Sequence, residues 1–215
     1  MLDLSGNGLV HPVASCWFWN LTSLKYLYLS DNRLYGMVPN SLGDMSSIRV
    51  LDFSYNRPVP IGLSDLLPSD QADMYTFSDA DDTEFTDGWG LTIRTADIRK
   101  LCNLETLDFA QSLISGNITE IFESLAQCPS SKLQILSLRY NNITGILPNY
   151  MGMFYSLVKL DLSENYITGH IPSEIDMLKR LTYLDLSNNA LDYLPYEIGM
   201  LKELTYLDLS NNALD

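Results

Sequence analysis

Apolar residues recur along the chain in short segments of the form leucine-x-leucine, each bordered by polar residues. In LKYLYLSDN, side-chain alternation along a strand points Leu24, Leu27 and Leu29 to one face and Tyr26 and Tyr28 to the other. Each such segment therefore predicts a short strand with one buried face. Eight segments share the pattern, and they begin at Leu2, Leu27, Leu51, Leu107, Leu136, Leu160, Leu184 and Leu207.

The spacing of these segments shows that they are copies of one unit. Their starts are separated by 25, 24, 56, 29, 24, 24 and 23 residues. A period of about 20–29 residues with the pattern L-x-x-L-x-L-x-x-N is typical of the leucine-rich repeat. The asparagine stands where the chain turns out of the strand, and its amide can bond main-chain groups there. It is present at Asn7, Asn32, Asn56, Asn141, Asn165, Asn189 and Asn212.

The residues that return to the next strand are also patterned. In PNSLGDMSSIRVL, which begins at Pro39, apolar residues follow at steps of three, and the segments from Pro148, Pro172 and Pro195 repeat that frame. No single coil can bury such an edge alone, so neighbouring coils must stack on one continuous core. We therefore expect an α/β fold, a leucine-rich-repeat solenoid or horseshoe. Its concave face is a parallel sheet, and its convex face consists of short 3-10 or irregular segments.

The pattern weakens between about residues 57 and 93. We interpret this stretch as one distorted repeat with a loop and a strand near 72–77, which makes about nine repeats in a single domain, 1–215. From Asp65 to Asp87 there are eight acidic residues and no Lys or Arg. A calcium loop beginning at Asp79 fails, because Glu84 stands where the turn needs glycine and Gly90 where a bidentate Glu is needed. We predict a solvated acidic loop there.

Composition and cysteines limit the possible partners and the compartment. The net charge of −14 argues against binding to nucleic acid or to anionic membranes. Cys102 and Cys128 fall on adjacent coils and could pair, but we favour single buried thiols; Cys16 is the third cysteine. No apolar run is long enough to span a bilayer, and no signal peptide precedes the first repeat.

Three N-x-[ST] sequons suggest secretion of the parent protein. They lie on turns or returning segments, where a glycan projects without entering the core. The candidate glycosylation sites are Asn20, Asn117 and Asn142.

Three segments narrow the class further: LYGMVPNSLG, ITGILPNYMG and ITGHIPSEID. Together with WFWNLTSLKYLYLS and LCNLETLDFA, they resemble the plant-specific leucine-rich repeat. The chain is similar to ectodomains of plant receptor-like proteins, especially the defence-receptor group of grasses. That resemblance implies a receptor at the extracellular face of the plasma membrane. It implies peptide or protein ligands, and signalling through partner receptor kinases in defence or development.

The sequence also departs from that family. A signal peptide, the two cysteine-containing caps and a membrane helix are absent, and NNALDYLPYEIG lacks the glycine before its proline segment. These departures, and the repeated LTYLDLSNNALD at the end, suggest a fragment or a truncated gene product. A secreted inhibitor of cell-wall-degrading enzymes, similar to polygalacturonase inhibitors, is the alternative function.

The concave face is the expected binding surface. The central column of aspartates resembles an anionic ladder, although Asp is also the ordinary residue of this repeat, and we favour that second interpretation. Aromatic and Arg residues on an exposed face are common anchors, although tyrosines on strands also pack across strands. The candidate ligand-binding residues are Tyr26, Tyr28, Asp52, Asp108, Arg139, Tyr140, Lys159, Asp161, Tyr183, Asp185 and Tyr206.

Catalysis is not expected. The two histidines, His11 and His170, lie beside prolines on distant repeats, and no nucleophile motif, metal-spaced cluster or phosphate-binding glycine loop appears. We expect no enzyme activity, no cofactor and no metal.

Overall fold

The short leucine-x-leucine segments form the strands of one parallel sheet. The computed structural model describes residues 1–57, 90–112, 114–128 and 131–215. Eight strands pair in the order β1-β3-β5-β7-β9-β11-β13-β15, so every coil contributes one strand beside that of its neighbour. These strands are Leu2–Asp3, Tyr26–Tyr28, Val50–Asp52, Thr106–Asp108, Ile135–Ser137, Lys159–Asp161, Tyr183–Asp185 and Tyr206–Asp208. The solvent-facing side of this sheet is called the concave face below.

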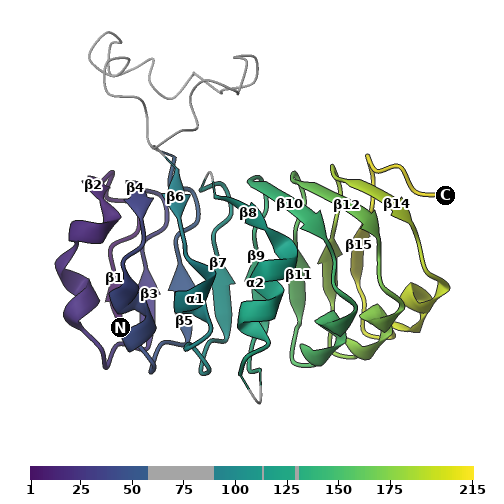
Figure 1. Ribbon diagram of the computed structural model, residues 1–215, viewed down its shortest axis with the longest axis horizontal. Helices are drawn as coiled ribbons and strands as arrows, with labels where there is room; N and C mark the ends of the chain where they lie inside the picture. The colour runs from purple at the N-terminus through teal and green to yellow at the C-terminus, as the bar shows by residue number, and fades with distance from the viewer. Residues whose placement is uncertain (58–89, 113, 129–130) are drawn as a thin grey trace, which may run out of the picture.

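A second layer of strands follows the turns. One sheet has the order β14-β12-β10-β8 and another the order β2-β4-β6. Figure 1 shows the coils stacked in one row from the purple N-terminal end to the yellow C-terminal end. The second-layer strands are β2 (Val10–Pro12), β4 (Arg33–Met37), β6 (Leu91–Thr92), β8 (Ser115–Asn117), β10 (Asn142–Ile146), β12 (Tyr166–His170) and β14 (Ala190–Tyr193). The predicted leucine-rich-repeat solenoid is confirmed.

The convex face is built mainly from 3-10 segments, as the steps of three predict. These are η1 (Val13–Ser15), η2 (Trp17–Asn20), η3 (Asn40–Asp44), η5 (Asn149–Met153), η6 (Ser173–Met177) and η7 (Tyr196–Met200). Two coils carry α-helices instead, α1 (Thr95–Ile98) and α2 (Ile118–Leu125). Asn117 caps α2 by accepting the backbone N–H of Thr119. The 29-residue interval between β7 and β9 provides the room for this helix.

Register in the sheet is fixed by the buried leucines. Leu51 pairs with Leu107, Leu136 with Leu160, and so on across the sheet. The leucines at this position from Leu27 to Leu184 are 0–1% exposed, which places them in the centre of the core.

The long interval between β5 and β7 does not add a strand to the concave sheet. Val50 pairs directly with Thr106, and Leu51 with Leu107. The second-layer strand of the β5 coil is β6, which starts at Leu91 and pairs with Gly36 and Met37 of β4. The β5 coil thus leaves its turn at Asn56 and resumes the repeat near Gly90. The distorted repeat, the strand near 72–77 and the acidic loop that we predicted fall largely on residues 58–89, outside the described residues.

The cysteine prediction was wrong, because Cys102 and Cys128 form a disulfide. Their Cα atoms are 5.2 Å apart, and the bond joins the returning segments of two adjacent coils. Stacking brings these segments side by side although 26 residues separate them in sequence. Cys16 remains a free, half-buried thiol, and burial raises its pKa.

Replacing Leu160 or Leu184 by Ala should lower the free energy of unfolding by about 2–5 kcal/mol, because each change leaves a cavity in the core. Leu207 holds the same repeat position but is 45% exposed, so Leu207→Ala is a matched control with a much smaller loss. Urea denaturation followed by circular dichroism measures all three. Equal losses at Leu184 and Leu207 would contradict the assigned core.

Candidate ligand-binding surface

Most aspartates of the concave face are held by the serine two residues later. Asp161 Oδ1 accepts the Ser163 hydroxyl at 2.8 Å, and Asp185 Oδ1 accepts the Ser187 hydroxyl at 2.7 Å together with its backbone N–H at 3.1 Å. The same arrangement recurs at Asp3, Asp52 and Asp208. This carboxylate oxygen therefore stabilises the turn after the strand, which explains why Asp is the ordinary residue at this position.

In the three C-terminal coils the other carboxylate oxygen also has a partner. Lys159 Nζ lies 3.7 Å from Asp161 Oδ2. The Tyr183 hydroxyl donates to Asp185 Oδ2 at 3.2 Å, and the equivalent contact in the last coil, from the Tyr206 hydroxyl, is 3.5 Å. Both carboxylate oxygens of these aspartates thus have a partner within the chain, although only Asp161 is paired with a cation.

Lys159, Tyr183 and Tyr206 themselves form one column across three strands. The Tyr183 and Tyr206 rings stack with centroids 4.3 Å apart and planes 3° apart, and Lys159 Nζ lies 4.8 Å from the centroid of the Tyr183 ring. Burial raises the pKa of Tyr183, and the charges of Asp161 and Asp185 raise it further. The phenol therefore stays protonated and remains a hydrogen-bond donor. Five predicted site residues thus lie together at β11–β15 and bind mainly one another.

The coils of β5 and β7 lack these partners. Val50 and Thr106 occupy the column that Lys159 and the two tyrosines fill farther along. No hydrogen bond or ion pair reaches Asp52 Oδ2 from any residue that the structure describes. Two neighbouring carboxylates therefore meet here without a direct ion pair among the described residues, although the charge of Lys159 still acts on Asp108.

Asp108 differs further, because Ala110 replaces the serine of the other coils. Its carboxylate keeps the Ala110 N–H at 2.9 Å but loses the hydroxyl. Burial raises the pKa of Asp108, and the charge of Asp52 adds to the rise. The Ser137 hydroxyl and Lys159 lower it without cancelling these effects. The Asp52–Asp108 pair is thus the least balanced part of the ladder.

Arg139 and Tyr140 border this pair on the next coil. Arg139 stands where other coils have serine; it is exposed, and its guanidinium has no hydrogen bond or ion pair within the described ranges. Tyr140 adopts φ 55° at the turn and is 38% exposed. Arg57 reaches over from the β5 coil, and its guanidinium lies 4.4 Å from the centroid of the Tyr140 ring.

Arg57 and Tyr55, both beside the turn residue Asn56, are not among the residues predicted from the sequence. Tyr55 is 54% exposed at the same turn position as Tyr140. A comparison of the residues that precede the turn asparagine in each coil would have identified Tyr55 as a candidate. Arg57 lies on the β5 coil and Tyr140 on the β9 coil, so their contact reaches past the β7 coil between them. No spacing of residues in the sequence predicts this contact.

Tyr26 and Tyr28 lie on β3, directly beside the Asp52 strand. Both are half-buried, and Tyr28 takes the place of the ladder aspartate in register with Asp52. The predicted residues therefore fall into two groups, at β3–β9 and at β11–β15. Within the described residues, no group of three or more His, Cys, Asp or Glu side chains is placed to hold a metal ion. The helices in that part of the chain are also too short or too polar to cross a membrane.

The three sequons differ in their surroundings. Asn20, at the end of η2, and Asn142, at the start of β10, are exposed. Asn117 is half-buried and already caps α2. Gly145 lies close to the side chain of Asn117. A Cβ atom built on Gly145 would lie 3.1 Å from the amide nitrogen of Asn117, so little space remains around that nitrogen.

Comparisons with known proteins agree with this architecture. A family model described as "Leucine rich repeat" matches residues 1–57, 131–191 and 155–214. The plant peptide hormone receptor RGFR1, solved in complex with RGF2, is 30% identical, with a TM-score of 0.71 over 99% of this chain and 27% of that one. The Arabidopsis receptor kinase HAESA, solved with the peptide hormone IDA and the co-receptor SERK1, is 26% identical, with a TM-score of 0.69 over 99% and 30%.

A TDR receptor is 30% identical, with a TM-score of 0.67 over 99% of this chain and 35% of that one. The chain therefore spans between 27% and 35% of the length of these receptor chains. No curated protein matches its sequence.

Asp108 and Asp208 should affect stability with opposite signs. The pKa of Asp108 is raised, so its ionisation costs stability above its folded pKa, and stability recovers as the pH falls toward the ordinary value of 3.8. Asp108→Asn should therefore be more stable than wild type near neutral pH, with a difference that vanishes on acidification. Urea midpoints across a pH series measure this.

The hydroxyl and backbone N–H of Ser210 lower the pKa of Asp208. Its contribution is present above pH 3.8 and is lost as the pH falls through the lower folded value. Asp208→Asn should therefore destabilise the chain near neutral pH. The same sign for both variants would disprove the assigned environments.

Expressed in a secretory host, the chain should carry glycans at Asn20 and Asn142 and little at Asn117. The glycan would be attached to Nδ2 of Asn117, which lies against Gly145, so a sugar has little room there. Mass spectrometry after enzymatic deglycosylation measures occupancy at each site, and Asn20→Gln and Asn142→Gln should each remove one glycan. Full occupancy at Asn117 would show that the crowding around its Nδ2 does not prevent glycosylation.

Proposed function

Because the chain belongs to the leucine-rich repeat family, we propose that it is a ligand-binding, non-catalytic part of a plant cell-surface receptor. Its ligand is a peptide or protein segment that binds the concave face. In support, RGFR1 and HAESA were solved with the peptide hormones RGF2 and IDA, and the HAESA complex also contains the co-receptor SERK1. A partner receptor kinase, a role in defence or development, and a place outside the plasma membrane belong to the same proposal.

The observation that carries the proposal is the pair of neighbouring carboxylates on β5 and β7. In the three C-terminal coils, Ser, Lys and Tyr side chains bind both carboxylate oxygens. Within the described residues, Asp52 and Asp108 have no such partners on their second oxygens apart from the Ser137 hydroxyl; burial raises the pKa of Asp108, and Lys159 lowers it only in part. A ligand cation at this pair would neutralise both charges. A hydrogen bond to a charged group contributes about 1.5–3 kcal/mol.

The surroundings of the pair suit a peptide. Tyr55 and Tyr140 are exposed, and aromatic residues and Arg are the commonest anchors of protein interfaces. Arg139 offers a guanidinium that has no partner among the residues that the structure describes. We therefore expect the ligand to place a Lys or Arg side chain, or its amino terminus, on Asp52 and Asp108, with neighbouring residues against Tyr55 and Tyr140.

The test uses a phage library of random short peptides selected on the purified chain. Enriched peptides should contain Lys or Arg, and isothermal titration with one synthetic peptide should show weaker binding to Asp52→Asn/Asp108→Asn. We expect a loss of roughly 10–100-fold, which corresponds to about 1.4–2.8 kcal/mol. The affinity should also fall as salt concentration rises.

The matched control is Asp185→Asn/Asp208→Asn. It removes the same charge from two aspartates whose second oxygens are occupied by Tyr183 and Tyr206. This variant should bind the same peptide nearly as wild type does, once circular dichroism has shown that both variants are folded. Equal losses in the two variants, or enriched peptides without cationic residues, would refute binding at Asp52 and Asp108.

A further inference from the structure

The convex face carries three exposed methionines in line. Met153, Met177 and Met200 are the last residues of η5, η6 and η7, and they are 52%, 51% and 45% exposed. The equivalent residue of η3 is Asp44, so this methionine stripe is confined to the three C-terminal 3-10 coils. Thioether side chains are flexible and apolar, and they are frequent on surfaces that bind other proteins.

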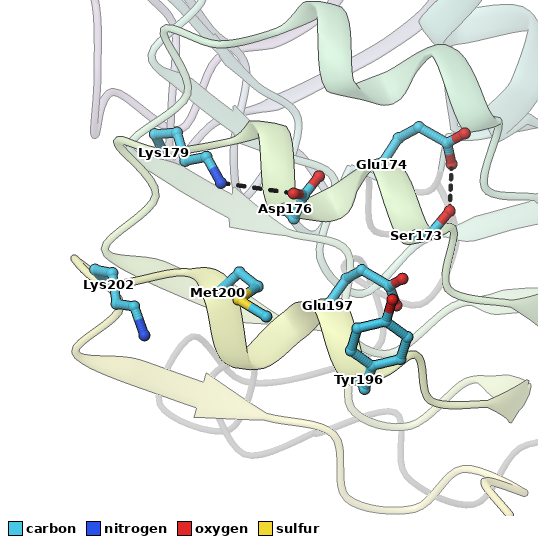
Figure 2. A pocket seen from close by; sticks show the side chains of 8 residues that line it. All are labelled: Ser173, Glu174, Asp176, Lys179, Tyr196, Glu197, Met200 and Lys202. Carbon is cyan, nitrogen blue, oxygen red and sulfur yellow. Dashed lines mark hydrogen bonds and ion pairs between the residues drawn. The ribbon is translucent and has the colours of Figure 1, made fainter.

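The stripe lies on coils that pack against one another. A Cβ atom built on Gly152 would lie 2.8 Å from the sulfur of Met177, so Met177 packs directly on the preceding coil. Between η6 and η7 the surface is hollowed, and Asp176, Tyr196 and Met200 line the hollow (Figure 2). Tyr196 is 77% exposed and adds to the apolar surface.

Opposite charges border the stripe on its two sides. Figure 2 shows Lys179 and Lys202 on one side of the hollow and Glu174 and Glu197 on the other. Lys179 is 63% exposed and lies 3.6 Å from Asp176, whereas the Glu174 carboxylate accepts the hydroxyl of its neighbour Ser173. Each of these two coils therefore presents a basic end and an acidic end. The middle is Met200 in η7, whereas in η6 Asp176 lies between the two ends beside Lys179.

This arrangement is complementary to itself. We propose that a second copy of the chain docks on the methionine stripe, with a two-fold axis parallel to the stripe. That rotation exchanges the two borders, so Lys179 faces Glu174 of the second copy and Lys202 faces Glu197 of the second copy. The methionines of the two copies then meet along the axis. A C2 interface of this kind uses the same surface on both subunits.

The charges on the two borders favour a second copy of the chain as the partner and determine its orientation. A two-fold axis lying in the interface but across the stripe would bring Lys against Lys and Glu against Glu, which is unfavourable. The parallel arrangement pairs every border charge of η6 and η7 with its opposite. Three coils offer a small contact area and each copy carries a net charge of −14, so the dimer is weak and concentration-dependent.

Two charge-reversal variants test the proposal by sedimentation equilibrium over a micromolar concentration series. Lys179→Glu/Lys202→Glu makes both borders acidic, and Glu174→Lys/Glu197→Lys makes both basic. Wild type should dimerise, and each variant alone should be monomeric. An equimolar mixture of the two should form a heterodimer, because acidic borders then face basic ones on both sides.

The control is Lys25→Glu/Lys132→Glu, which changes the net charge as the first variant does but lies away from the stripe. It should dimerise like wild type, and circular dichroism should show that every variant is folded. A monomeric wild type would overturn the proposal. So would variants that associate as wild type does, since contact through the exposed Leu207 at the end of the sheet would persist in them.

Discussion

The structure depends on the asparagine that ends each repeat motif. Its side chain replaces the hydrogen bonds that the backbone loses where the chain leaves the sheet. Asn165 donates to the carbonyls of Leu138 and Leu162 at 2.8 and 3.1 Å and accepts the Ile143 N–H at 3.0 Å. Each buried amide thus joins two coils and fixes their spacing, since unpaired buried groups are costly. Stacking of coils, and therefore the common core, follows from this contact.

The β7 coil has Ser112 at the position of this asparagine, and it keeps the hydrogen bond to the preceding coil through the serine hydroxyl. Ser112 donates its hydroxyl to Phe53 O at 2.6 Å, a carbonyl of the preceding coil equivalent to the one that Asn165 reaches. The accepting role passes to the backbone, because Leu91 N–H donates to Ser112 O at 3.2 Å. Hydrogen bonds therefore still join the β5 coil to the β7 coil where the β5 coil resumes at Gly90.

The sequence was sufficient for the repeat, the strands and the core, because these follow from a pattern with one period. It was insufficient where contacts join different coils. The cysteine pair, the stack of Tyr183 on Tyr206 and the contact of Arg57 with Tyr140 all depend on the relative height of neighbouring coils. The α2 helix was predictable in principle, since Ile118, Ile121, Phe122 and Leu125 have helical spacing. The three-step pattern of the other coils obscured it.

In a repeat protein, a position that departs from the pattern is informative, because the same position in the other coils serves for comparison. In the concave ladder, Asp161, Asp185 and Asp208 are explained by the serine and the tyrosine or lysine that bind them, so they need no ligand. Asp52 and Asp108 are the same residue type at the same position, but Val50, Thr106 and Ala110 have removed their partners. The cost of two neighbouring carboxylates is not offset within the described chain. The residues around a position, more than its own identity, therefore distinguish the scaffold aspartates from those of the proposed binding site on this face.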